Sequence, residues 1–153
     1  RLGYMIGPAR VVDAARKVHD FLTVGAPAPL QEAVVAALNL PDSYYENLRD
    51  MYTEKRNFFL EGLDSVGLKH NVPEGTYFVM VDITDFLALP QFAGMTDLEF
   101  CEWLIINIGV AAVPGSSFFK EDVNHLIRLH FAREISTLDE VIKRLAKLQD
   151  LLK

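Results

Sequence analysis

Cysteine is nearly absent from this sequence: Cys101 is the only one in 153 residues. A single cysteine excludes an intramolecular disulfide and a zinc site built from several thiolates. Scarcity of cysteine also suits a reducing compartment, so we expect a cytoplasmic protein whose one thiol is a small, buried apolar group.

Long hydrophobic runs and clustered basic residues are also missing. The apolar segments around 78–81 and 104–113 are short or interrupted by polar residues and glycine, well below the roughly 18 residues that a membrane span needs. The formal net charge is −6, and no basic stripe follows any predicted helix or strand. Nucleic-acid modules normally carry such a stripe. We therefore expect neither a membrane nor a nucleic acid as partner.

Several motifs of catalysis and ligand binding are absent as well. The chain contains no G-x-S-x-G nucleophile elbow, and the Gly-Ser pair at 115–116 lacks the G-x-x-x-x-G-K pattern of a phosphate loop. His125 and His130 are five residues apart, which places them on opposite faces of a strand. They cannot share one ion there, so we expect no metal site.

The composition that remains is that of a globular domain, with half of the residues hydrophobic and 24% charged. The patterns predict an α/β (α+β) fold in which helices cover a small sheet of about three to four strands. The predicted strands are Leu2–Ile6, Tyr77–Asp82, Val110–Val113 and Leu126–Ala132. The Tyr77–Asp82 segment is apolar on both faces, which is typical of a covered central strand. Helices are predicted after Pro8, from Leu30 to Leu40, from Tyr44 to Val66, from Thr96 to Asn107, and from Thr137 onward.

Three S/T-x-x-E sequences resemble helix-starting capping boxes. They are Ser43 with Glu46, Thr96 with Glu99, and Thr137 with Glu140. Between the first two predicted helices, residues 23–29 hold two prolines and a glycine, which predicts a stiff irregular connection.

Arg128 is a charged residue in the middle of a predicted strand, so its position requires an explanation. It alternates with Ile127 and Leu129, so its side chain leaves the apolar side of its strand. Arginine can bind a carboxylate through two parallel hydrogen bonds. On the strand pattern alone, a solvated arginine on an open sheet face is the favoured interpretation, and a carboxylate site is the alternative.

The segment Pro114–Phe119 follows a buried strand and presents hydroxyl groups and aromatic rings at a rim. Such a loop can line a ligand pocket, although a plain exit from the strand explains the same pattern.

Four segments together resemble one known family. Arg1-Leu2-Gly3-Tyr4 is similar to the end of a cofactor-lysine motif, and residues 74–82 are similar to a G-x-Y-x-x-x-D strand. Residues 115–119 and 127–132 resemble the ending P-G-x-x-F … R-(L/I)-x-(F/Y)-A. In this order they resemble the class I/II pyridoxal-phosphate aminotransferases of fold type I, in the branch with aspartate, aromatic and kynurenine transaminases. The resemblance covers essentially the whole chain.

The resemblance implies roles for three residues. Arg1 matches an arginine that binds the phosphate of pyridoxal phosphate, Arg128 matches the arginine that binds the substrate α-carboxylate, and Phe118 resembles an aromatic residue of the substrate pocket. With the strand argument, this makes carboxylate binding the preferred interpretation of Arg128. The implied substrates are an amino acid and a 2-oxo acid, and the implied assembly is a homodimer.

The family's cofactor lysine would precede Arg1, and no lysine of this chain matches its position. The resemblance therefore implies the C-terminal part of an enzyme, inactive on its own. Residues 1–30 would be a strand and linking helix of the large domain, and residues 31–153 the small domain. Without its sheet, the strand at 2–6 would have no partner in this chain.

Two alternatives stay open at this point. Other fold type I enzymes, such as carbon–sulfur lyases and decarboxylases, use the same small domain. A stand-alone binding or dimerisation module without catalytic function is the second alternative, since a fold does not fix a function.

Overall fold

The computed structural model describes residues 2–152. The chain divides into two compact units, Arg1–Glu46 and Asn47–Lys153. The boundary falls near the start of helix α3 (Asp42–Ser65). The predicted division at residue 30 concerns the family's domains and stays a prediction.

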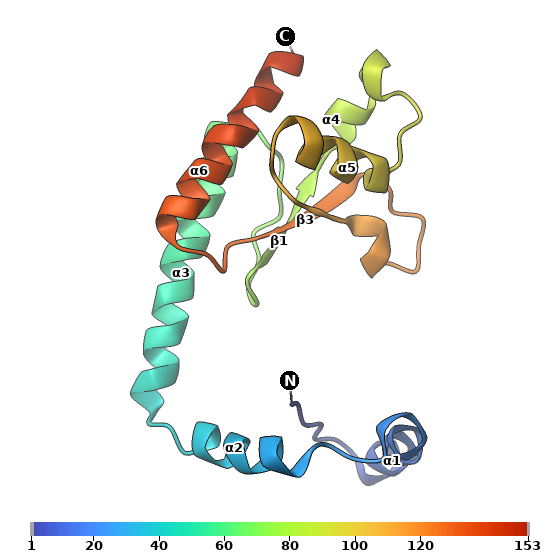
Figure 1. Cartoon of the computed structure of the whole chain (residues 1–153), viewed down its shortest axis with the longest axis vertical. Coiled ribbons are helices and arrows are strands. Elements are labelled where there is room, and N and C mark those ends of the chain that lie inside the picture. Colours follow the sequence, from blue (N-terminus) through green and yellow to red (C-terminus); the bar gives the residue numbers. More distant parts are fainter. Residues whose placement is uncertain (1, 153) are drawn as a thin grey trace. The chain divides into compact units, whose positions relative to one another are not determined.

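The first unit is built from helices. Helix α1 spans Ala9–Thr23 and helix α2 spans Ala28–Leu38, drawn in blue in Figure 1. The connection between them is irregular, as predicted, and Val24 within it has a φ of 63°. Pro27 precedes α2, and the fixed φ of Pro29 fits the first turn of this helix.

Residues 2–6 form no strand, although their sequence predicts one. A strand needs a hydrogen-bonding neighbour, and every strand of residues 2–152 lies in the second unit. The expectation that this segment has no partner in the chain stays a prediction.

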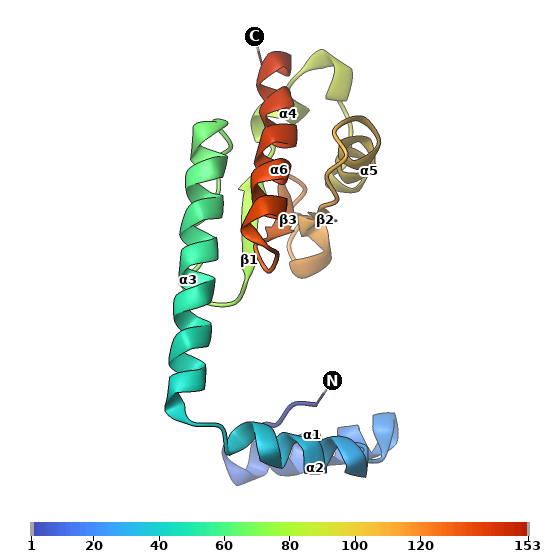
Figure 2. The same ribbon diagram turned by 60° about the vertical axis from the view of Figure 1, so that its left-hand side comes forward.

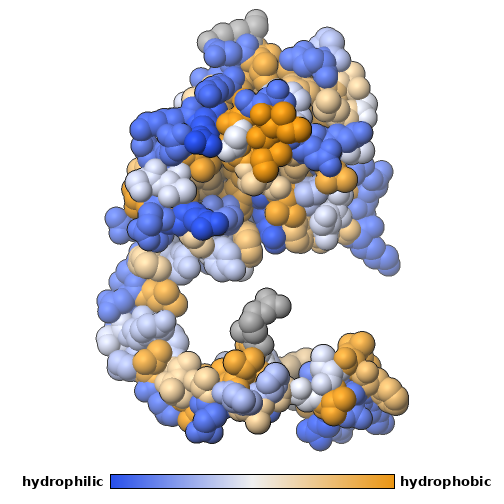
Figure 3. Space-filling view, in the orientation of Figure 1, coloured by the Kyte–Doolittle hydropathy of each residue, from blue (hydrophilic) through white to orange (hydrophobic). Residues whose placement is uncertain are grey.

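The first unit has little core of its own. Neither α1 nor α2 contains a buried residue. Phe21 is 92% exposed, Ile6 87% and Val24 82%. Hydrophobic atoms are accordingly visible on the surface of this unit in Figure 3. Apolar exposure on this scale is typical of a surface that packs against other protein atoms.

The second unit contains an antiparallel three-stranded sheet of order β1-β3-β2, in line with the predicted three to four strands. The strands are β1 (Phe78–Asp82), β2 (Val113–Pro114) and β3 (Leu126–His130), with β1 beside β3 in both ribbon views (Figures 1 and 2). Arg128 lies opposite Met80 on one side and Val113 on the other. The central strand is therefore β3.

The prediction that Tyr77–Asp82 is a covered central strand is wrong, because β1 lies at the edge of the sheet. Its outer side is paired instead with an irregular segment. Asp82 donates its N–H to the carbonyl of Lys69 at 2.8 Å, and Asn71 donates to the carbonyl of Met80 at 3.1 Å. These bonds satisfy some of the backbone N–H and carbonyl groups that an edge strand would otherwise leave unpaired. Val110 is buried but precedes β2, so the predicted strand 110–113 begins later than expected.

Helices α3, α5 (Asp97–Asn107) and α6 (Ile135–Leu145) surround the sheet's apolar face. Short helical segments complete the unit: α4 (Thr84–Leu87), η1 (Pro90–Phe92), η2 (Gly115–Phe118) and η3 (Ala146–Leu151). The fully buried side chains of the core include Phe59, Leu63, Val79, Val81, Phe92, Phe100, Leu104, Phe131, Leu138 and Leu145. No helix within residues 2–152 is long and apolar enough to cross a membrane.

Only the middle capping box of the three has the predicted geometry. Thr96 Oγ1 accepts from the N–H of Glu99 at 3.2 Å, and the Glu99 carboxylate accepts from the N–H of Thr96 at 2.8 Å. Ser43 lies inside α3, which begins at Asp42 after Pro41. Thr137 lies inside α6, which begins two residues earlier.

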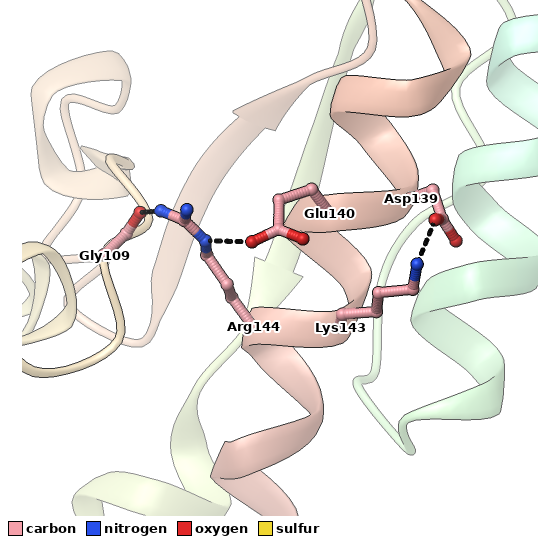
Figure 4. A network of polar contacts seen from close by, with 5 residues as sticks. All are labelled: Gly109, Asp139, Glu140, Lys143 and Arg144. Carbon is pink, nitrogen blue, oxygen red and sulfur yellow. Dashed lines mark hydrogen bonds and ion pairs between the residues drawn. The ribbon is translucent and has the colours of Figure 1, made fainter.

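Glu140 serves a different purpose from capping. Its carboxylate accepts from Arg144 Nε at 2.8 Å, and Arg144 also donates to the carbonyl of Gly109 at 2.9 Å (Figure 4). Gly109 ends α5 with a φ of 77°. The arginine thus ties α6 to the end of α5, beside the surface pair of Lys143 with Asp139.

Gly62 lets α3 approach α6, which runs beside it in Figure 2. A Cβ at this position would lie 2.1 Å from Cδ1 and 2.6 Å from Cγ1 of Ile142. We expect Gly62→Ala to lower the free energy of unfolding by about 1 kcal/mol, because overpacking outweighs the helix-propensity gain. In an Ile142→Ala background the same change should stabilise the protein. Urea unfolding tests both, and stabilisation by Gly62→Ala in the native background would contradict the packing.

Candidate functional site

Arg128 occupies the face of the sheet that turns away from the core. Ile127 and Leu129 are buried, whereas Arg128 between them is half-buried. The predicted alternation along this strand is therefore confirmed, and the arginine is available to a ligand on the face of the sheet away from the core.

Two aromatic rings flank the guanidinium group of Arg128. Its Cζ lies 3.9 Å from the ring centroid of Phe78 and 3.9 Å from that of Phe118. Both distances are well inside the range in which a cation is attracted to a ring face. We call Arg128, Phe78 and Phe118 the arginine cluster.

The antiparallel register explains why Phe78 is there. Phe78 pairs with His130 and Met80 pairs with Arg128, so Phe78 is the diagonal neighbour of Arg128 on the same face. Diagonal neighbours across two strands are close enough for aromatic and long side chains to touch.

Phe118 reaches the cluster because its segment is pressed against the start of β3. Gly115 leaves no room for a side chain: a Cβ there would lie 2.5 Å from the carbonyl oxygen of Leu126. Glycine is therefore needed for the close approach of two backbones.

A buried carboxylate holds the same segment. Asp97 is 2% exposed, and its oxygens accept from the Ser116 N–H at 2.8 Å, the Ser116 hydroxyl at 3.1 Å and the Leu98 N–H at 3.0 Å. Hydrogen bonds to an ionised acceptor are stronger than neutral ones. Asp97 thus joins the start of α5 to the turn that carries Phe118.

The electrostatics of the cluster favour an anion. Arg49 and Arg144 have carboxylate partners, but no acidic side chain of residues 2–152 forms an ion pair with Arg128. Burial lowers the pKa of His130 on the same face, and the charges of Arg133 and Arg128 lower it further. The imidazole is therefore neutral near pH 7, and the guanidinium remains the charge that a ligand meets.

Cys101 is unsuited to nucleophilic chemistry. It is buried in α5, and burial together with the charge of Asp97 raises the pKa of its thiol to about 11. A thiol with this pKa is protonated at neutral pH, which confirms the expectation of a small apolar core group.

Of the three predicted site residues, the structure brings Arg128 and Phe118 into contact. Arg1 lies outside the described residues. The prediction omitted Phe78, which lies two residues before Met80 on β1 and enters the site through the register between β1 and β3.

The described residues do not assemble the rest of a cofactor site. No lysine belongs to the arginine cluster, and those with ion pairs are engaged elsewhere: Lys55 near Glu134, Lys69 with Asp85, and Lys143 with Asp139. Within residues 2–152, no three histidine, cysteine or acidic side chains gather closely enough to hold a metal ion. The cluster can bind a carboxylate, and it contributes no amine for covalent chemistry.

The sequence profile "Aminotransferase class I and II" matches residues 1–145. The chain belongs to this family. The aminotransferases of this family depend on pyridoxal phosphate and act on amino acids and 2-oxo acids.

Individual relatives agree with this assignment. The chain is 38% identical over 149 residues to the methionine aminotransferase of Escherichia coli K12, covering 97% of this chain and 37% of the relative. It is 32% identical to kynurenine–oxoglutarate transaminase 1 of Mus musculus, covering 95% of this chain and 38% of the relative. The structure of N-succinyldiaminopimelate aminotransferase from Mycobacterium tuberculosis matches with a TM-score of 0.74 and 35% identity, over 93% of this chain and 36% of that one. The chain thus spans well under half the length of these aminotransferases.

Proposed function

We propose that the complete protein is an aminotransferase that moves an amino group from an amino acid to a 2-oxo acid through pyridoxal phosphate. We further propose that this chain supplies the arginine that binds the substrate α-carboxylate. The main support for this proposal is the surroundings of Arg128. Its guanidinium contacts two aromatic rings and has no acidic partner among the described residues.

Arg128 would act by binding and orienting the substrate. A guanidinium donates two parallel hydrogen bonds to a carboxylate, which fixes the direction of the bonds at the neighbouring carbon. Holding the substrate in this way keeps its reacting bonds in the orientation that the reaction needs. Pyridoxal phosphate, when bound, supplies the electron-withdrawing chemistry that labilises those bonds.

We propose that residues 1–153 alone lack transaminase activity, because none of their lysines matches the position of the family's cofactor lysine. The exposed apolar surface of α1 and α2 supports the idea that other residues of the complete enzyme cover the first unit. A cytoplasmic homodimer is the expected setting of that enzyme.

The test is an assay of the complete gene product, purified with pyridoxal phosphate, on amino acids of different side chains. An aminotransferase consumes the amino acid only when a 2-oxo acid is present and returns one new amino acid for each one consumed. Release of carbon dioxide or of a thiol without a 2-oxo acid would instead show a decarboxylase or a carbon–sulfur lyase. Absence of any reaction would overturn the proposal in favour of a non-catalytic module.

A further inference from the structure

We propose that Phe78 and Phe118 are positioning residues that hold the Arg128 guanidinium in the orientation in which it binds a carboxylate. This inference rests on the proposed function. It assigns Phe118 an action through Arg128, in place of the expected role in lining the substrate pocket, and it adds Phe78 to the site.

Both rings contact the guanidinium of Arg128 directly. Both centroids lie 3.9 Å from Arg128 Cζ, and Phe78 makes its ring contact with Tyr77 at 4.4 Å, while no ring contact joins Phe78 to Phe118 among the described residues. The rings therefore flank the cation instead of packing on each other. Among the described residues the Arg128 side chain donates no hydrogen bond, so its N–H groups are free to bind a carboxylate.

Each ring is supported by a different part of the fold. Phe78 stands on β1 and packs against Tyr77, whose ring stacks on that of Tyr52 in α3 at 6.0 Å between centroids. Phe118 is held by the turn that Asp97 anchors through Ser116. The guanidinium is thus fixed between two separately supported side chains.

This arrangement reduces the cost of binding a substrate. A free arginine side chain loses much rotational freedom when both of its hydrogen bonds to a carboxylate form. A guanidinium already restrained between two rings has lost that freedom before the substrate arrives. The benefit is the same for every substrate with an α-carboxylate, whatever its side chain.

The experiment compares Phe118→Leu and Phe78→Leu in the complete enzyme, each alone and combined with Arg128→Lys. KM is measured for amino acids with small, acidic and aromatic side chains. We expect each phenylalanine variant to raise KM for all of them by roughly fivefold, with a smaller change in kcat. In the Arg128→Lys background the same variants should add little, because the planar cation is gone.

Phe119→Leu is the matched control. Phe119 is 42% exposed against 45% for Phe118, and the structure gives it no ring or cation contact among the described residues. Thermal melting of each variant separates loss of fold from loss of binding. Because Phe118 is exposed, its replacement tests the inference even if Phe78→Leu unfolds the protein.

The outcomes are distinct. A KM effect confined to substrates with large side chains, or no effect of Phe118→Leu, would overturn the positioning role while leaving Arg128 as the carboxylate site. Full activity of Arg128→Lys would instead overturn the proposed function of Arg128, and the positioning role with it.

Discussion

Replacing Arg128 by lysine in the complete enzyme is expected to lower kcat/KM about a hundredfold for every amino-acid substrate. Lysine keeps the charge but presents a single ammonium group, so it cannot form the paired, coplanar hydrogen bonds of a guanidinium. Loss of one charge-assisted hydrogen bond reduces transition-state stabilisation by about 1.5–3 kcal/mol, a range that includes a hundredfold lower kcat/KM. The rings of Phe78 and Phe118, 3.9 Å from the guanidinium, would also lose their planar partner.

Steady-state kinetics of the amino-acid half-reaction test this prediction. Arg133→Lys is a suitable control, because Arg133 is an exposed arginine shortly after the same strand. The control should retain the native kcat/KM. Equal kcat/KM for Arg128→Lys and the native enzyme would show that the carboxylate is bound elsewhere.

Replacing Asp97 by alanine is expected to lower the free energy of unfolding by about 2–4 kcal/mol. The change removes the acceptor of three hydrogen bonds and leaves the Ser116 N–H without its partner in a partly buried place. Because Asp97 also anchors the turn that carries Phe118, KM should rise together with the loss of stability.

Unfolding in urea and steady-state kinetics of the same variant measure the two effects. Asp139→Ala serves as the control, since the Asp139 carboxylate is about half exposed and pairs with Lys143 at the surface. Exposed ion pairs contribute little, so the control should unfold like the native protein. A stable Asp97→Ala variant with native KM would mean that the turn holds its place without the carboxylate.

Hydrophobic periodicity predicted most of the second unit correctly because its elements are amphipathic. The alternation around Arg128 placed Ile127 and Leu129 in the core and the arginine on the other face, as the structure has them. The Thr96–Glu99 capping box was found because both of its bonds are local, within one helical turn.

The errors arose where distant parts of the chain decide the outcome. An apolar β1 resembles a central strand, but an irregular segment at 69–71 covers its edge instead of another strand. At Thr137, the capping pattern is present, yet Glu140 is taken by Arg144 and α6 starts earlier. Such competition is decided by tertiary contacts, which a local motif does not contain.

Only part of the candidate site could be predicted from the sequence, because tertiary contacts bring its other residues together. Arg128 follows from its strand and from the family's motif, whereas Phe78 depends on the register between β1 and β3. Asp97 was not singled out, because an acidic residue at the start of a helix is common at surfaces. Only the fold shows that it is buried and bonded to Ser116, 19 residues along the chain.

A crystal structure of the complete protein with pyridoxal phosphate and a substrate-like carboxylic acid would show which residues bind the substrate carboxylate. We expect both carboxylate oxygens within hydrogen-bond distance of the Arg128 guanidinium, with the rings of Phe78 and Phe118 still beside it. A carboxylate bound to other residues, with Arg128 facing solvent, would contradict the assignment of Arg128 as the carboxylate site.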